Sequence, residues 1–245
     1  MEFIISLTSF GRRLMNTAPS TIKSLLDQTE KADRIILWLS YDTIVPKDLA
    51  ILEREGLEIK FCPDFKSYNK LIPALTHYPN DILITVDDDV YYPKDWFRKT
   101  KLSYIGSPFN IHVNRAHEIK IENETLQFYK DWRFCVTAVQ KEISIFPTGV
   151  GGILYPPKSL HPDVLCSSIF SSLAPKGDDI WFWAMARLYN TKYTIVEKGY
   201  KDLVNVDPSD TGMWINNVFH NGNDIQLIRV LQKYPKLLKL LEELI

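Results

Sequence analysis

The sequence predicts an α/β fold with a Rossmann-like, mostly parallel central sheet flanked by helices. Short apolar, β-branched runs alternate with helical patterns through about the first hundred residues, which is the order of strands joined by helical crossovers. The run from Ile82 to Val86 is apolar almost throughout, as in central strands covered on both faces, and it ends in Asp87, Asp88 and Asp89. In such sheets ligands bind at the carboxyl ends of the strands, where these acids lie.

The elements of the first half follow from the spacing of apolar residues. The expected strands are Phe3 to Leu7, Arg34 to Ser40, Leu57 to Cys62 and Ile82 to Val86. Helices are expected from Thr17, with Pro19 in the first turn, and from Pro46 to Glu55. No Gly-x-Gly-x-x-Gly follows the first strand, which argues against a dinucleotide cofactor.

The pattern is weaker from about Ser103 to Gln140. Residues 110–117 favour a strand, and residues 128–134 favour an aromatic loop. His112 and His117 are five positions apart, which is not the spacing of two ligands on one helical face. We therefore interpret both as structural histidines.

Glycines interrupt the segment Phe146-Pro-Thr-Gly-Val-Gly-Gly-Ile-Leu-Tyr-Pro-Pro157. Gly149, Gly151 and Gly152 permit close approaches that a side chain would block, so a sugar or a diphosphate fits there. The alternative is a bulged strand entry that Pro156 and Pro157 close.

Helices dominate the prediction after Gly177. Asp178 and Asp179 open an apolar helix, where a carboxylate is commonly only an N-cap. Residues 225–245 predict two short helices interrupted at Pro235. We favour core packing or an oligomer contact for them, because Glu242 and Glu243 dilute the basic face that a membrane surface would require.

Composition narrows the function classes. The 245 residues carry 29 basic and 30 acidic side chains, so no global field attracts nucleic acid and no nucleic-acid partner is expected. Cys62, Cys135 and Cys166 lack the paired spacing of a zinc site or a disulfide framework. With no apolar window long enough to span a bilayer and no signal segment, we expect a cytoplasmic protein, with peripheral contact at the inner face of the membrane as an alternative.

The three adjacent acids point to a metal ion. Asp87, Asp88 and Asp89 repel one another unless a cation or donor groups offset their charge. Carboxylate oxygens suit Mg²⁺ or Mn²⁺, which commonly recruit substrate phosphates to complete their coordination. The alternative is a solvated turn that caps the helix suggested by Pro93 and the residues after it.

An apolar strand that runs into Asp87-Asp88-Asp89 resembles the DXD motif of glycosyltransferases with the GT-A fold. Further segments resemble bacterial family-2-like sugar transferases of surface polysaccharide synthesis: Ile5-Ser-Leu-Thr-Ser-Phe10, Ser24-Leu-Leu-Asp-Gln-Thr29, Ile35-Ile-Leu-Trp-Leu-Ser40 and Gly177-Asp-Asp-Ile-Trp181. Together they cover most of the chain. The resemblance implies one GT-A domain with a smaller mixed acceptor-side sheet, divided into a nucleotide-binding half (1–100), a donor-sugar and acceptor half (101–222) and C-terminal helices (223–245).

Several residues at the predicted sheet edge gain roles from this resemblance. It implies that the base, ribose and diphosphate of a nucleotide sugar, with UDP as the expected nucleotide, lie against Thr8, Arg13, Asp64, Lys70, Asp87 and Asp88. Arg13 or Lys70 is the candidate phosphate contact, and the adjacent Arg12 is an alternative to Arg13. The resemblance also implies that Gly151 and Gly152 border the donor sugar, that Asp89 holds Mn²⁺ or Mg²⁺, and that His220 is the candidate second metal ligand.

Asp178 and Asp179 resemble the Glu-Asp pair of inverting GT-A transferases, with Asp179 in the position of the catalytic base. Attack of an acceptor hydroxyl on the anomeric carbon requires such a base. Because Asp178 is shorter than the Glu of the family, the division of work between the two acids stays open.

The resemblance implies transfer to a saccharide or lipid-linked saccharide. Rival functions are a retaining GT-A transferase, a metal-dependent phosphohydrolase or nucleotidyltransferase, and a non-catalytic module that stacks sugars on Trp181 and Trp183.

Overall fold

The computed structural model describes residues 1–197, 203–207 and 221–244 of the chain. Its central sheet contains β1 (Phe3–Thr8), β2 (Arg34–Ser40), β3 (Leu57–Cys62), β4 (Ile82–Thr85), β6 (Ile111–Val113), β12 (Ile153–Tyr155) and β13 (Tyr193–Ile195). The α-helices are α1 (Arg13–Asn16), α2 (Ala18–Leu26), α3 (Lys47–Leu52), α4 (Ile72–His77), α5 (Trp96–Gly106), α6 (Ser167–Leu173), α7 (Asp178–Leu188), α8 (Gly222–Lys233) and α9 (Pro235–Glu242). The 3₁₀ turns are η1 (Glu53–Glu55), η2 (Lys66–Lys70), η3 (Tyr129–Asp131), η4 (Glu142–Ser144), η5 (Gly149–Gly151) and η6 (Pro162–Leu165).

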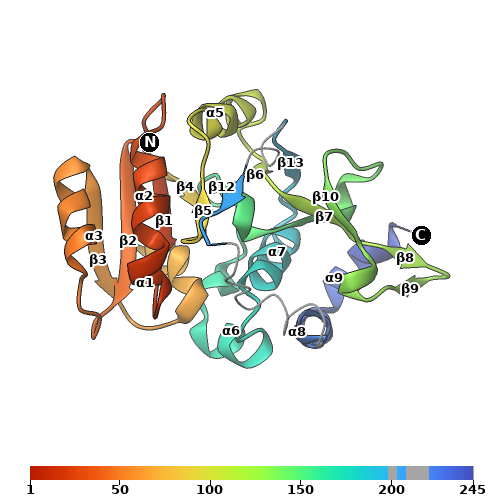
Figure 1. Cartoon of the computed structure of the whole chain (residues 1–245). Coiled ribbons are helices and arrows are strands. Elements are labelled where there is room, and N and C mark those ends of the chain that lie inside the picture. Colours follow the sequence, from red (N-terminus) through yellow and green to blue (C-terminus); the bar gives the residue numbers. More distant parts are fainter. Residues whose placement is uncertain (198–202, 208–220, 245) are drawn as a thin grey trace.

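The central sheet has the strand order β13-β6-β12-β4-β1-β2-β3. Strands β1 to β4 are parallel to one another, whereas β12 runs antiparallel to both β4 and β6. The predicted α/β class with a mostly parallel sheet is therefore confirmed. Strands from both halves of the chain share this one sheet, as the ribbon colours in Figure 1 show.

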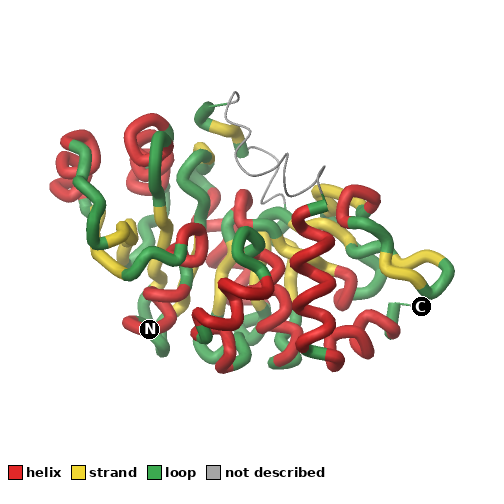
Figure 2. The backbone as a smooth tube through the Cα atoms, turned by 90° about the horizontal axis from the view of Figure 1, so that it is seen from below, coloured by secondary structure: helices red, strands yellow, loops and turns green. Residues whose placement is uncertain are grey.

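Helices cover both faces of the sheet (Figure 2). Alternate residues of each strand point to opposite faces, so Ile4 and Ile5 of β1 belong to two different apolar cores. Ile5 packs with buried residues of α2, α3 and α5, and Ile4 packs with those of α4, α6 and α7. Burial on both faces explains why β1, β2 and β4 are apolar almost throughout.

The strands expected in the first half are confirmed, with Arg34–Ser40 and Leu57–Cys62 at the predicted bounds. The segment expected as one strand over residues 110–117 forms two, β6 and β7 (Ala116–Glu118), which belong to different sheets. The chain turns between them at Asn114 and Arg115.

Smaller antiparallel sheets flank the central one. Strands β10 (Arg133–Val136) and β11 (Ile145–Pro147) pair with β7, while β8 (Ile121–Glu122) pairs with β9 (Thr125–Leu126). Strand β5 (Val90–Tyr91) pairs with β14 (Val204–Asn205). The sheet with β7 and the β8–β9 hairpin extend on the right of Figure 1.

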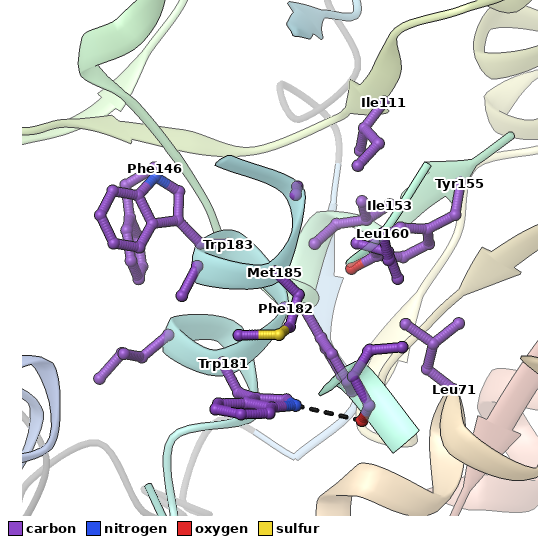
Figure 3. Close-up of a cluster of buried hydrophobic side chains, with 14 of the residues drawn as sticks. Leu71, Ile111, Phe146, Ile153, Tyr155, Leu160, Trp181, Phe182, Trp183 and Met185 are labelled. Atoms are coloured by element: carbon purple, nitrogen blue, oxygen red, sulfur yellow. Dashed lines mark hydrogen bonds between the residues drawn. The ribbon is translucent and has the colours of Figure 1, made fainter. Parts of the chain in front are cut away.

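Helix α7 passes through the core of the second half. Trp181 and Trp183 are 0% and 1% exposed, and Trp181 Nε1 donates a hydrogen bond to the carbonyl of Val164 at 3.2 Å. Figure 3 shows both rings among other buried side chains, including Phe146 and Phe182. Because neither ring reaches solvent, the stacking surface required by the saccharide-module hypothesis is absent from these two residues.

The C-terminal helices pack on the domain, as the sequence favoured. Leu227, Val230 and Leu231 of α8 are buried, as are Leu237 and Leu241 of α9. Among the described residues, no helix combines the length and the apolar character that crossing a bilayer requires.

Candidate active site

The candidate site lies at the carboxyl edge of the parallel strands. Strands β1 and β4 end there at Thr8 and Thr85. Because β12 is antiparallel to β4, with Ile153 opposite Thr85, the glycine segment (Gly149 to Gly152) enters β12 at the same edge. Segments far apart in the chain therefore meet where Asp87, Asp88 and Asp89 follow β4.

Lys70 lies at the centre of the first group of contacts. Its Nζ is 2.9 Å from Oδ1 of Asp87 and 2.7 Å from Oδ2 of Asp178, and its side chain is 7% exposed. Burial opposes the charged ammonium, but the nearby carboxylates of Asp178, Asp87 and Asp179 raise the pKa of Lys70 well above its usual value. The lysine stays protonated and joins the acidic strand end to the start of α7.

Asp179 accepts hydrogen bonds from the backbone N–H of Gly149 through both carboxylate oxygens, each at 3.1 Å. Burial, with the like charges of Asp178 and Asp87, raises the pKa of Asp179 to about 7, although Lys70 and the Gly149 N–H oppose the rise. As a whole residue, Asp179 is partly exposed. Its raised pKa makes the carboxylate a stronger base than that of an ordinary aspartate.

Neither acid caps its helix. The N-cap of α7 is Gly177, with no side-chain capping hydrogen bond, and both aspartates stand inside the first turn. Their carboxylates instead contact Lys70 and Gly149, on other segments. The N-cap alternative for these acids is wrong in this structure.

Asp88 and Asp89 form the second group of contacts. Ser9 donates a 2.5 Å hydrogen bond to Asp88, and Arg13 Nη1 lies 3.3 Å from Asp88 Oδ1 and 2.9 Å from Asp89 Oδ2. Burial raises the pKa of Asp88, while Ser9 and Arg13 oppose the rise. Of the two candidate arginines, Arg13 reaches the acids, whereas Arg12 is exposed. The acids are not a solvated turn, and α5 begins without a side-chain cap.

Two predicted site residues make contacts outside these groups. Thr8 donates its hydroxyl to the carbonyl of Trp38 at 2.8 Å, which ties β1 to β2. Asp64 is exposed after β3 and pairs with Lys66, whose backbone N–H donates to it at 2.9 Å. Their contacts with a nucleotide stay predictions, as do the phosphate contacts of Arg13 and Lys70.

The glycine segment is closely packed by protein atoms. Gly152 has φ of +84°, and a Cβ there would lie 2.5 Å from the ring of Trp96. A Cβ on Gly151 would lie 2.7 Å from Arg115. A Cβ on Gly149 would lie 2.6 Å from Lys70 Nζ and 3.2 Å from Asp179 Oδ1. Gly149 therefore directly contacts the group formed by Lys70, Asp87 and Asp179. The donor-sugar contacts of Gly151 and Gly152 stay predictions.

Sequence reasoning missed two residues that organise the site. Ser9 directly follows the first strand, and this position was the available signal for its contact with Asp88. Tyr92 accepts a hydrogen bond from the N–H of Asp87 at 3.1 Å and donates one to the carbonyl of Val150 at 3.2 Å. Tyr92 thereby connects the glycine segment to Asp87 at the end of β4. No local sequence pattern indicates this contact.

The buried histidines are structural, as the sequence favoured. His112 contacts Ser103 Oγ and the carbonyl of Ser107 at 2.8 and 3.0 Å. His117 Nδ1 accepts the N–H of Cys135 at 3.1 Å, and burial lowers the pKa of His117 to about 3. Both rings serve packing and loop geometry.

A divalent ion fits the donor chemistry of the site. Within the described parts of the chain no three His, Cys, Asp or Glu side chains form a ready metal cluster. Magnesium-type ions, however, are commonly held by one or two carboxylates together with substrate phosphates. Asp89, whose side chain is 19% exposed, offers such a carboxylate. His220 lies outside the described residues.

No protein-family model and no curated protein matches the sequence. Among solved structures, S. aureus TarS 1–349 aligns with a TM-score of 0.53 at 12% identity over 94% of this chain, and its complex with UDP aligns with 0.51 at 13% identity. The alignment spans 66% of that fragment. A 4-diphosphocytidyl-2C-methyl-D-erythritol synthase also aligns with 0.53, at 8% identity over 89% of this chain and 98% of its own. At these identities the comparisons establish the GT-A type of fold alone.

Proposed function

We propose that the chain is a metal-dependent, inverting glycosyltransferase that moves a sugar from a nucleoside diphosphate to a saccharide hydroxyl. The observation that carries the proposal is the meeting of Asp87, Asp178 and Asp179 around Lys70, at the sheet edge where α/β proteins bind ligands. The resemblance of the sequence to transferases of surface polysaccharide synthesis agrees with it. The direct test is release of UDP from a panel of UDP-sugars, with and without saccharide or lipid-linked saccharide acceptors and Mn²⁺.

In the proposed mechanism Asp179 takes the proton of the acceptor hydroxyl as that oxygen attacks the anomeric carbon. The N–H of Gly149 fixes the orientation of the carboxylate, and its raised pKa makes it an effective base near neutral pH. Asp87 and Asp88 border the nucleotide and the donor sugar. A divalent ion at Asp89 would offset the charge on the leaving diphosphate.

Two comparisons support a pyrimidine nucleotide. TarS was solved in complex with UDP, and the name of the aligned synthase places a diphosphocytidyl group in its product. Both structures share with this chain the fold whose strand edge carries Asp87 to Asp89. UDP is therefore the first nucleotide to test.

The rate of transfer is expected to depend on the ionisation of Asp179. Because the protonated acid cannot accept a proton and its pKa is raised to about 7, kcat/KM should rise with pH up to about 7 and level off above it. Initial rates at fixed Mn²⁺ and ionic strength, between about pH 5 and pH 9, measure this dependence. A profile that is flat across neutral pH contradicts the assignment of the base.

Asp89→Ala is expected to lose the Mn²⁺-dependent part of UDP binding, because it removes the proposed metal carboxylate. Isothermal titration with UDP, with and without Mn²⁺, measures the loss. Asp42→Ala is the matched control, since Asp42 is exposed shortly after β2 ends and belongs to neither group of contacts. Identical Mn²⁺ dependence in Asp89→Ala and the parent protein contradicts the metal site.

A nucleotidyltransferase is the second candidate, because the aligned synthase matches over 98% of its own length. That reaction would release pyrophosphate from a nucleoside triphosphate, whereas sugar transfer releases UDP. A phosphate acceptor is already ionised at neutral pH and needs no general base, so the raised pKa of Asp179 favours a hydroxyl acceptor. Assays with CTP and UTP separate the two reactions, and NMR of the product anomer separates inversion from retention.

A further inference from the structure

The side chain of Lys70 is almost completely enclosed by protein, and its ammonium lies between two carboxylates. Lys70 ends η2, its side chain is 7% exposed, and its Nζ lies 2.9 Å from Asp87 and 2.7 Å from Asp178. The contact with Asp87 is a hydrogen bond, and the contact with Asp178 is a close ion pair without hydrogen-bond geometry. These contacts direct the ammonium toward protein carboxylates.

The backbone of Lys70 is anchored to the centre of the sheet. Its carbonyl accepts a 2.6 Å hydrogen bond from Ser6 Oγ, and Ser6 Oγ accepts one from Trp38 Nε1 at 3.0 Å. Ser6 and Trp38 are 0% and 1% exposed, and the adjacent Leu71 is fully buried. The lysine is therefore held by β1 and β2, which are rigid elements of the core.

The position of Lys70 compensates a concentration of negative charge. Asp87 follows β4, and Asp178 and Asp179 open α7, so two segments bring carboxylates to one place. Buried like charges repel strongly, and removing one partner of a buried ion pair leaves the other uncompensated. The single ammonium between Asp87 and Asp178 allows the two segments to approach.

We propose that Lys70 is a positioning residue which bridges the acidic end of β4 and the first turn of α7, and thereby holds Asp179 against Gly149. This inference rests on the proposed function, in which Asp179 is the base. The inference assigns Lys70 to carboxylates of the protein, in place of the substrate phosphate that the sequence predicted as its partner. The space beside Gly149 supports it, since a Cβ there would lie 2.6 Å from Lys70 Nζ and 3.0 Å from Asp87 Oδ1.

Among the described residues, the charged groups that act most strongly on Asp179 come from three segments. They are Lys70 on η2, Asp87 after β4 and Asp178 on α7. Its charge also acts on the phenol groups of Tyr68, Tyr129, Tyr155 and Tyr193. Of these groups only Lys70 is a cation, so within the part of the chain that the structure describes its removal leaves Asp179 facing these acids and hydroxyls.

The functional test compares Lys70→Met with the parent protein in three measurements. We expect kcat to fall about 100-fold, the loss typical of a misplaced catalytic group, with little change in donor KM. We expect the acid limb of the pH profile to move to higher pH, because the cation that favours ionised Asp179 is gone. We expect Kd for UDP with Mn²⁺ to be unchanged.

Weakened UDP binding, with the pH profile unmoved, would show instead that Lys70 is a phosphate ligand and overturn the proposal. Lys70→Gln is the second variant if Lys70→Met does not fold, because its amide can still donate to Asp87. Lys101→Met is the matched control. Lys101 pairs with Glu30 at 2.6 Å at the surface, with 30% and 36% of the side chains exposed.

A double-mutant cycle tests the bridge independently of activity. Urea denaturation of Lys70→Met, Asp178→Asn and the double variant should be non-additive, with the double variant more stable than the sum of the single losses indicates. Additive losses would overturn the bridge. The cycle measures the coupling between Lys70 and Asp178 even if the protein turns over no sugar donor. In that case the proposed function fails, and the bridge is still accepted or rejected from the urea data.

Discussion

Asp179→Asn is expected to lower kcat by about 10³-fold, within the range that general base catalysis contributes. The amide oxygen can still accept the N–H of Gly149, but the side chain can no longer take a proton. Affinity for UDP should be retained, because Asp179 is assigned to the acceptor hydroxyl. Steady-state assays with the donor identified in the panel, together with calorimetric titration of UDP, measure both quantities.

The stability of this variant provides an internal check. The pKa of Asp179 is raised to about 7 in the folded protein. Ionisation of Asp179 therefore lowers the free energy of unfolding as the pH rises from the pKa of an aspartate in the unfolded chain toward about 7. Asn carries no such cost, and Asp179→Asn should therefore resist urea better than the parent protein above neutral pH. The advantage should shrink as the pH falls and the parent carboxyl group takes up its proton.

Asp95→Asn is the matched control for Asp179→Asn. Asp95 also stands at the start of a helix, but it pairs with Lys99 at 3.0 Å and 38% of its side chain is exposed. It should leave turnover unchanged. Undiminished turnover in Asp179→Asn would reject the base assignment, and equal losses in both variants would indicate a general effect on the fold.

Gly149→Ala is expected to lower kcat by about 100-fold, the same loss as is expected for Lys70→Met. The added methyl group would lie 2.6 Å from Lys70 Nζ, 3.0 Å from Asp87 Oδ1 and 3.2 Å from Asp179 Oδ1. Lys70 is enclosed, so the methyl group must displace either the ammonium or the base. The loss should appear in kcat for sugar transfer, measured beside the circular dichroism of the folded protein.

Gly106→Ala controls for the loss of a glycine. A Cβ at Gly106, the last residue of α5, meets no atom within 4 Å. That variant should keep full activity. Parent-like kcat in Gly149→Ala would mean that the glycine segment can move away from the acids, which contradicts its proposed role in orienting Asp179.

The predictable part of the fold was local. Strands β1, β2 and β4 are mostly apolar runs, because helices cover both faces of the sheet, and such runs can be recognised from the sequence alone. Strand β3, at the edge of the sheet, instead alternates apolar and polar residues. The three acids after Val86 could also be singled out from the sequence, since a turn does not by itself require carboxylates directly after a buried strand. Strand β12 was harder to place, because no residue in Ile153–Tyr155 specifies insertion between β4 and β6 in the antiparallel sense.

By itself the sequence determined the class of fold, the sheet edge that carries Asp87 to Asp89 and the acidic start of α7. Each of these features is specified by residues that are neighbours in the sequence. Only the tertiary structure decided that Lys70 lies between Asp87 and Asp178, and that Gly149 donates to Asp179. These contacts join residues 17 or more positions apart. Their partners are selected by burial and by charge compensation in the folded chain, which no local pattern encodes.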